Sequence, residues 1–240
     1  MIIVGGGIVG TYCAYEFATH GLKTVLLERQ ELAAGASSRG GGLLLKGATD
    51  VYAAEIVPHL LTNQHLLEEF IQRHNAEVDY VREGSLFVCF EEDAESTQTL
   101  MEEMNAAGLP SEWWSPRELQ GRFPALTRRA VGGRFIPSDA QLTPLRLCTS
   151  FAKAARETGA DIRTHQNVLS LLRDSNHQVI GVQTDQESFY SRQIVLATNA
   201  YTGHLIPELK SIIIPTRGQA FLTFPVQPSF LFACASNQDL

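Results

Sequence analysis

Val4-Gly5-Gly6-Gly7-Ile8-Val9-Gly10 lies close to the N-terminus, between an apolar segment and a segment of helical character. Its glycines at positions 5, 7 and 10 fit the pattern GxGxxG. Gly5 permits a tight turn out of a strand, Gly7 lets backbone approach a pyrophosphate, and Gly10 lets helix and strand pack closely. The unpaired N–H groups at the start of the helix offer partial positive charge to phosphates. The stretch therefore predicts a dinucleotide site.

The residues around this turn predict a tight βαβ unit. Residues 1–4 read as a buried strand, residues 8–20 as a helix that Gly21 stops, and residues 23–28 as a second buried strand. Parallel strands need a crossover helix, so we expect an α/β fold with a doubly wound sheet covered by helices. Glu28 follows Gly10 by 18 residues, where a carboxylate accepts hydrogen bonds from ribose hydroxyls. These features do not separate FAD from NAD.

The rest of the chain returns to this sheet several times. Helices are expected over residues 52–74, 93–107 and 143–159, a capping box at 115–118, and strands over 78–90, 161–164, 194–197 and 212–224. Residues 167–192 alternate polar and apolar around turns, which predicts an antiparallel meander. We expect two interleaved domains: residues 1–77 with 137–211, and residues 78–136 with 212–240.

Composition excludes some classes of function. The chain has 240 residues, 44% of them hydrophobic, and a net charge of −7, which disfavours nucleic acid as a partner. We find no signal peptide and no transmembrane segment, and expect a cytoplasmic protein. The four cysteines lie far apart without a metal-binding pattern, so we expect buried free thiols and no metal site.

The loop after the second strand favours FAD. Glu28-Arg29, followed by residues 35–42 (GASSRGGG), resembles the FAD-binding region of the D-amino-acid oxidase superfamily, which includes glycine oxidases, sarcosine oxidases and D-amino-acid dehydrogenases. Residues 137–146, Val168, residues 196–201 and residues 215–219 extend the resemblance in the same order. The fold it implies is a Rossmann-like FAD-binding domain of the glutathione-reductase type, interleaved with a mixed-sheet α+β substrate domain.

The resemblance also implies which residues hold the cofactor. A serine and backbone amides of the loop meet the pyrophosphate, loop glycines lie against the flavin, the backbone at Val168 binds adenine, and the turn at Ala197 and Thr198 passes close by. The expected cofactor-binding residues are Gly5, Gly7, Ile8, Val9, Gly10, Glu28, Arg29, Ser37, Ser38, Arg39, Gly41, Gly42, Val168, Ala197 and Thr198.

The reaction that the resemblance implies is hydride transfer from the carbon beside a substrate amine to flavin N5, on an amino acid or secondary amine. We name no catalytic acid or base. Arg39 is either a cation near the flavin or a structural arginine, and Arg217 more readily packs domains than binds substrate. The tryptophans at 113 and 114 read as packing residues, and the histidines, including His165 and His204, as isolated.

Three alternatives stay open. The same motifs suit an FAD-dependent 2-hydroxyacid oxidoreductase. Members of the superfamily continue past position 240, so the chain is also interpreted as a truncated or partner-dependent FAD-binding chain without independent activity, with a partner subunit or oligomer. The third alternative is an NAD-dependent dehydrogenase, for which the similarity of the loop from Ser37 to Gly42 to an FAD-binding loop would be a coincidence.

Overall fold

The computed structural model describes residues 1–47, 53–124, 126–216, 218 and 233–235, which form two compact units. Unit 1 contains Met1–Gly41, Ala76–Val78 and the described part of Thr143–Phe221. Unit 2 contains the described parts of Gly42–Asn75 and Asp79–Leu142, together with the strand Ala233–Ala235. The predicted domains differ from these units at their boundaries: the prediction assigns residues 42–75 and 137–142 to the first domain, whereas both ranges belong to unit 2.

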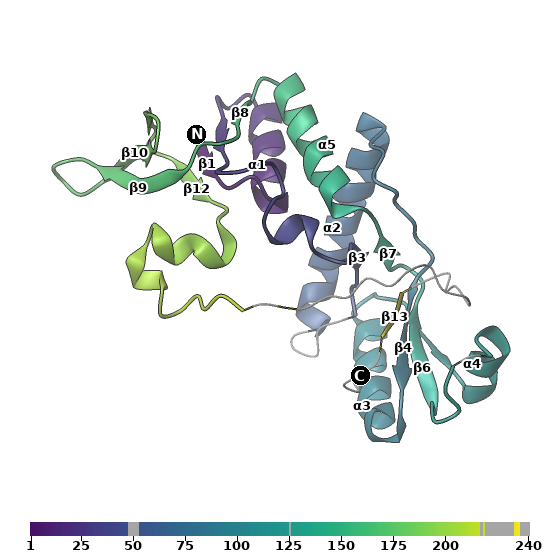
Figure 1. Cartoon of the computed structure of the whole chain (residues 1–240). Helices are drawn as coiled ribbons and strands as arrows, with labels where there is room; N and C mark the ends of the chain where they lie inside the picture. Colours follow the sequence, from purple (N-terminus) through teal and green to yellow (C-terminus); the bar gives the residue numbers. More distant parts are fainter. Residues whose placement is uncertain (48–52, 125, 217, 219–232, 236–240) are drawn as a thin grey trace. The chain divides into compact units, whose positions relative to one another are not determined.

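A four-stranded parallel sheet forms the centre of unit 1 (Figure 1). Its strands are β1 (Ile2–Val4), β2 (Val25–Leu27), β8 (Asp161–Arg163) and β12 (Ile194–Leu196), in the order β12-β1-β2-β8. In β1 and β2 almost every residue is buried, as expected for a strand covered on both faces. The predicted return of residues 161–164 and 194–197 to the parallel sheet is confirmed.

Two helices, α1 (Ile8–Thr19) and α5 (Pro144–Glu157), lie side by side in unit 1 (Figure 1). The rings of Tyr12 and Phe151 meet between them, with centroids 5.1 Å apart. The helix α1 is followed by Gly21 at φ 75°, a conformation that suits glycine after a helix end. Proline at the first position of α5 has the φ that a helix start requires.

The antiparallel meander predicted for residues 167–192 is confirmed as strands β9 (Val168–Arg173), β10 (Val179–Thr184) and β11 (Ser188–Tyr190). Val182 of this meander is fully buried in one cluster with Ile2, Val4 and Leu27 of the parallel sheet. The meander therefore covers one face of that sheet. Alternation along the strands presents Ile3 and Leu26 to the other face. The described part of unit 1 also contains three short 3₁₀ helices: Ala36–Ser38, Asn199–His204 and Pro207–Leu209.

Unit 2 is built on a mixed sheet. Its order is β13 (Ala233–Ala235), β4 (Ser85–Cys89), β6 (Gly132–Ile136) and β5 (Glu112–Trp114), with β13 parallel to β4 and the other pairs antiparallel. Its other elements are α2 (Ala53–His74), α3 (Glu91–Ala106), α4 (Pro116–Arg122) and the short pair β3 (Leu43–Leu44) and β7 (Ala140–Gln141). The α/β fold with a second, mixed-sheet part is confirmed.

Two hydrophobic clusters hold unit 2 together. Leu86, Val88 and Trp114 pack with Leu119 of α4, and Trp114 also stacks on Phe135 with centroids 4.4 Å apart. The second cluster brings together Val57 of α2, Met104 of α3, Leu109 after α3 and Ile136 of β6. The predicted packing role of Trp114 is confirmed.

Some predicted elements differ from the structure. The strand expected from residue 78 begins only at Ser85, and strands β5 and β6 were not predicted. Residues 212–216 of the strand expected over 212–224 are not in a strand, and Ile212 and Ile214 are about three-quarters exposed. Arg217 and residues 219–224 lie outside the described residues. No helix among the described residues is both long and apolar enough to cross a bilayer.

Candidate functional site

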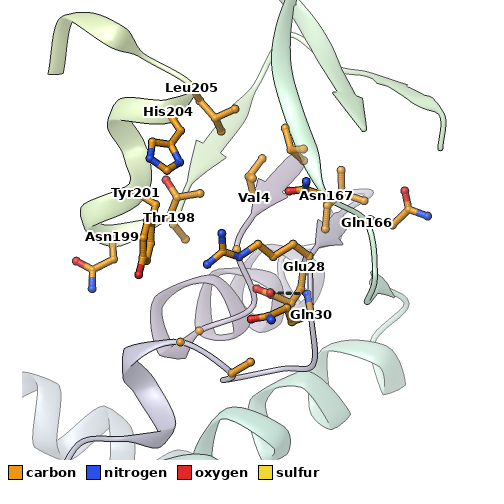
Figure 2. Close-up of a pocket in the computed structure, with 18 of the residues that line it drawn as sticks. Val4, Glu28, Gln30, Gln166, Asn167, Thr198, Asn199, Tyr201, His204 and Leu205 are labelled. Carbon is orange, nitrogen blue, oxygen red and sulfur yellow. Dashed lines mark hydrogen bonds between the residues drawn. The ribbon is translucent and has the colours of Figure 1, made fainter. Parts of the chain in front are cut away.

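A pocket of about 370 Å³ opens at the carboxyl ends of β1, β2 and β12, all within unit 1. This edge of a parallel sheet is where α/β proteins bind ligands. Figure 2 shows Thr198, Tyr201 and His204 on one side, Gln166 and Asn167 on the other, and Val4 and Glu28 between them. Segments far apart in the chain therefore converge on one cavity.

The glycine turn at the pocket depends on three glycines for different reasons. Gly5 has φ 108°, which other residues rarely adopt, and a Cβ there would lie 2.5 Å from the carbonyl oxygen of Ala197. A Cβ on Gly10 would collide with the carbonyl oxygen of Gly5. A Cβ on Gly7 would lie 2.9 Å from the hydroxyl oxygen of Ser37. The tight turn at Gly5 and the close helix approach at Gly10 therefore require glycine, as predicted.

The N-terminus of α1 presents backbone donors at this turn. Thr11 is the first residue whose N–H bonds back into the helix, to the carbonyl of Gly7. The N–H of Ile8 donates to the hydroxyl oxygen of Ser37 at 3.0 Å. The N–H groups of Val9 and Gly10 precede the first intrahelical bond and have no intrahelical acceptor. Together with the helix dipole, these groups favour an anion.

Glu28 follows β2 directly, and its carboxylate lies against the glycine turn. One carboxylate oxygen accepts from the N–H of Gly6 at 2.7 Å. The other accepts from the N–H of Gln30 at 2.9 Å (Figure 2). Each oxygen has further acceptor capacity. The Glu28 backbone bonds to the carbonyl of Arg163 and the N–H of Gln166, which holds the residue at the sheet edge. A carboxylate so placed suits hydroxyl donors of a ligand.

An aromatic ring and a guanidinium form another part of the pocket wall. The Arg29 guanidinium carbon lies 4.9 Å from the centre of the Tyr201 ring, a distance at which cation and ring attract. Both residues line the pocket, and the Tyr201 ring also lies 5.8 Å from that of His204. Tyr201 is about half exposed, so its ring is available to a ligand.

The structure brings together about half of the expected cofactor-binding residues. Those that line the pocket are Gly5, Gly7, Glu28, Arg29, Ser37, Val168, Ala197 and Thr198. Ile8, Val9 and Gly10 form the helix start beside it, while Ser38, Arg39, Gly41 and Gly42 continue along the loop and do not line it. The Arg39 side chain is exposed, and its two interpretations both stay open.

Other lining residues were missed from the sequence. They include Gln30, Gln166, Asn167, Asn199, Tyr201, His204 and Leu205. His204, for which the sequence offers no partner at a metal or triad spacing, lies at the pocket. The sequence could have indicated two of these residues. Asn199 and Tyr201 follow the strand β12, and the loops after parallel strands meet at one edge of the sheet, where ligands bind.

Several ionisable groups among the described residues lie outside the pocket. In the part of the chain that the structure describes, no His, Cys, Asp and Glu side chains gather to hold a metal ion. Burial raises the pKa of the Cys89 and Cys148 thiols, which keeps both protonated. In unit 2 the buried Lys46 ammonium lies 3.2 Å from Asp139; burial lowers its pKa, and Asp139 opposes this shift.

The family described as FAD dependent oxidoreductase matches residues 1–238. One of the subunits of anaerobic glycerol-3-phosphate dehydrogenase from Escherichia coli K12 is 29% identical over 232 residues, covering 92% of this chain and 42% of that protein. Glycine oxidase of Geobacillus kaustophilus is 25% identical over 228 residues, covering 92% of this chain and 60% of that protein.

The same glycine oxidase has a crystal structure similar to this chain. The TM-score is 0.77 at 24% identity, over 87% of this chain and 57% of that one, which supports the fold. In each of these comparisons the chain spans less than two thirds of the other protein's length.

Proposed function

The chain belongs to the FAD dependent oxidoreductase family, and from this premise we propose that it binds FAD and oxidises the C–N bond of an amino acid or secondary amine. The observation that carries the proposal is the pocket of unit 1, where a glycine turn, a helix N-terminus and the Glu28 carboxylate converge. Similarity to glycine oxidase supports the choice of substrate class.

The groups around the pocket fit FAD. Gly7 leaves open space at the helix start that a Cβ would fill, beside the hydroxyl of Ser37. In our proposal the amides of Val9 and Gly10 and the Ser37 hydroxyl bind the pyrophosphate, and Glu28 accepts from the ribose hydroxyls. Val168 contributes its backbone to adenine, and Ala197 and Thr198 border the cofactor.

The loop beyond the pocket completes the proposed site. Ser38, Arg39, Gly41 and Gly42 are proposed to contact the cofactor farther from its adenosine end. When bound, FAD accepts the hydride that leaves the carbon next to the substrate nitrogen. The protein's part is to hold the ligand in place and to orient it, as the contacts of Glu28 and Ser37 allow. We further propose that unit 2 contributes to substrate binding.

A second candidate is oxidation of a C–O bond in a hydroxyl-bearing substrate such as a 2-hydroxyacid. The similarity to one chain of a glycerol-3-phosphate dehydrogenase favours it, because identity to that protein is 29% against 25% for the glycine oxidase. That relative is named as one of several subunits, so a third candidate is an FAD-binding chain that acts only with a partner.

Absorption spectroscopy tests the cofactor and then the substrate class. The purified chain, supplied with FAD, should show a flavin spectrum that dithionite bleaches, and heat should release FAD. Anaerobic bleaching by amino acids or N-methyl amines would support the first candidate, and bleaching by 2-hydroxyacids or glycerol 3-phosphate the second. A flavin that only dithionite bleaches would favour the partner-dependent candidate. A chain that takes up no FAD would refute the proposal.

A further inference from the structure

One wall of the pocket is held by a turn that does not itself line the pocket. The wall consists of residues 166–169, which follow β8 and include the Gln166 and Asn167 labelled in Figure 2. The turn consists of residues 184–186, at the end of β10 and before β11. The structure describes all three of these residues, and none of them is in the lining. We call residues 184–186 the clamp.

Two residues of the clamp bind the backbone of the wall and of the residue before it. Asp185 holds Asn167 at two points: its carboxylate accepts from the Asn167 N–H at 3.1 Å, and its own N–H donates to the Asn167 carbonyl at 3.0 Å. The side-chain amide of Gln186 donates to the carbonyl of His165 at 2.6 Å. The clamp therefore fixes the chain on both sides of Gln166.

The Gln166 side chain also joins the wall to the clamp. Its amide N–H donates to the side-chain oxygen of Gln186 at 2.8 Å, and its own oxygen accepts from the Thr184 hydroxyl at 3.0 Å. Gln166 is 7% exposed and Thr184 is 1% exposed. Loss of one partner in such a buried network leaves another polar group without its hydrogen bond, so the network resists movement of the wall. The N–H of Gln166 donates to the carbonyl of Glu28 at 2.8 Å, which connects the clamp to Glu28 as well.

The backbone just before the wall is in a conformation that needs such support. His165 has φ 57°, in the left-handed region that favours glycine. A residue other than glycine keeps this conformation only where its surroundings hold it there. The bond from Gln186 to the His165 carbonyl is one such restraint. If the clamp is weakened, His165 can relax, and Gln166 and Asn167 then move with it.

We propose that Asp185 and Gln186 are positioning residues for the cofactor, which set the affinity for FAD by holding the wall in place. The inference rests on the proposed FAD binding and deepens it. Neither side chain lines the pocket, so both act through residues 165–167. A substitution in the clamp therefore weakens FAD binding without removing any group that lines the site.

Flavin-fluorescence titrations of the flavin-free full chain with FAD test the proposal. Asp185→Ala should weaken FAD binding about fivefold, the effect of losing one hydrogen bond. Asp185→Asn keeps an acceptor oxygen for the Asn167 N–H and should remain within about twofold of the unmodified chain. Gln186→Ala should weaken FAD to a similar degree as Asp185→Ala. Both positions are exposed, so either variant makes the test if the other does not fold.

Asp174→Ala is the matched control, in the other turn of the same meander. The Asp174 carboxylate accepts from the N–H groups of Asn176 and Gln178, each at 2.9 Å, and these three residues do not line the pocket. Urea unfolding should show similar losses of stability for Asp174→Ala and Asp185→Ala, because each removes hydrogen bonds of one turn. FAD affinity should fall only in Asp185→Ala.

The titrations separate failure of this inference from failure of the proposed function. If Asp185→Ala binds FAD as tightly as the unmodified chain, or if Asp174→Ala weakens FAD equally, the clamp has no positioning role, while FAD binding stands. If Asp185→Asn loses as much affinity as Asp185→Ala, the hydrogen bond to Asn167 is not the cause and the inference is wrong. If the unmodified chain takes up no FAD, the proposed function fails as well.

Discussion

Single residues at the glycine turn control how closely α1 approaches the sheet. Gly10 lies so near the carbonyl of Gly5 that an added methyl group would overlap it, and its next neighbour would be the Ala197 side chain, 3.4 Å away. Neither the Gly5 carbonyl nor Ala197 is a flexible chain end that can move aside. Strain at this position therefore reaches both β1 and the loop after β12.

We expect Gly10→Ala to destabilise the chain by about 1–3 kcal/mol, the usual cost of overpacking, and to weaken FAD binding. Urea unfolding and a flavin titration would measure the two effects. Gly40→Ala is the matched control, because a Cβ on Gly40 meets nothing within 4 Å. Equal stability of the two variants would show that the turn adjusts at little cost.

Lys46 and Asp139 form a buried ion pair in unit 2. Their side chains are 5% and 1% exposed. Asp139 also accepts from the Ser85 hydroxyl at 2.6 Å and from the Lys46 N–H at 3.0 Å. The Lys46 ammonium donates to the carbonyl of Ser138 as well. The pair thus connects the chain after β3 to the start of β4 and to the turn before β7.

We expect Lys46→Met to lower the free energy of unfolding by about 3–5 kcal/mol, because it leaves the Asp139 carboxylate buried without a counter-charge. Lys46→Met combined with Asp139→Asn should recover part of the loss. Lys153→Met, at an exposed position, should change stability by less than about 0.5 kcal/mol in the same urea titration. A loss no larger than that of Lys153→Met would contradict the prediction.

At the scale of elements, the short helix α4 depends on its capping box. The Ser115 hydroxyl accepts from the N–H of Glu118, whose carboxylate accepts from the Ser115 N–H at 2.7 Å. Hydrogen bonds from the Ser115 side chain and backbone lower the pKa of Glu118 below its ordinary value of 4.5. A lowered pKa means that the ionised carboxylate stabilises the folded state above pH 4.5, and that this contribution is lost as the pH falls through the folded-state pKa.

Glu118→Gln should therefore destabilise the chain near neutral pH and lose part of this effect at a pH well below 4.5. Ser115→Ala should cost about 1 kcal/mol as a lost N-cap, and in that background Glu118→Gln should make little further difference. Urea unfolding of the two single variants and the double variant at both pH values measures these effects. A Glu118→Gln effect that is the same at both would mean that the carboxylate charge is not involved.

At the scale of the whole molecule, each unit contains hydrophobic clusters of its own. Among the described residues, one such cluster lies on the parallel sheet of unit 1, and others lie on the mixed sheet of unit 2. The pocket lies in unit 1 alone. A ligand that binds the folded pocket stabilises the state that contains it.

We expect FAD at about 100 times its Kd to stabilise the fold by about 2.7 kcal/mol. Hydrogen exchange should show the largest gain in protection in residues 1–41 and 194–205, and a small gain in residues 112–136, where β5, α4 and β6 lie. Exchange rates of peptides from these regions, compared with and without FAD, measure the gain in protection. Equal gains in both regions would place the main contacts of the ligand outside the predicted pocket.

Local patterns accounted for most of the secondary structure. The capping box at 115–118, the helices α1, α3 and α5 and the meander follow their predictions because their signals lie within a few residues. In the helix α2, Val57 is fully buried whereas the neighbouring Ile56 is exposed. Strand β6, with two glycines and an arginine, carries no strand pattern and is held by its pairing to β4 and β5.

The sequence alone determined the strand, glycine turn and helix at residues 2–19 and the position of Glu28 after β2, because these depend on conformational limits and spacing within one βαβ unit. Only the tertiary structure decided that Asn167, Tyr201 and His204 share a pocket with them. Their convergence follows from the order β12-β1-β2-β8, which brings segments more than 130 residues apart to one edge of the sheet. Such an order results from packing of the whole unit, and no short stretch of residues encodes it.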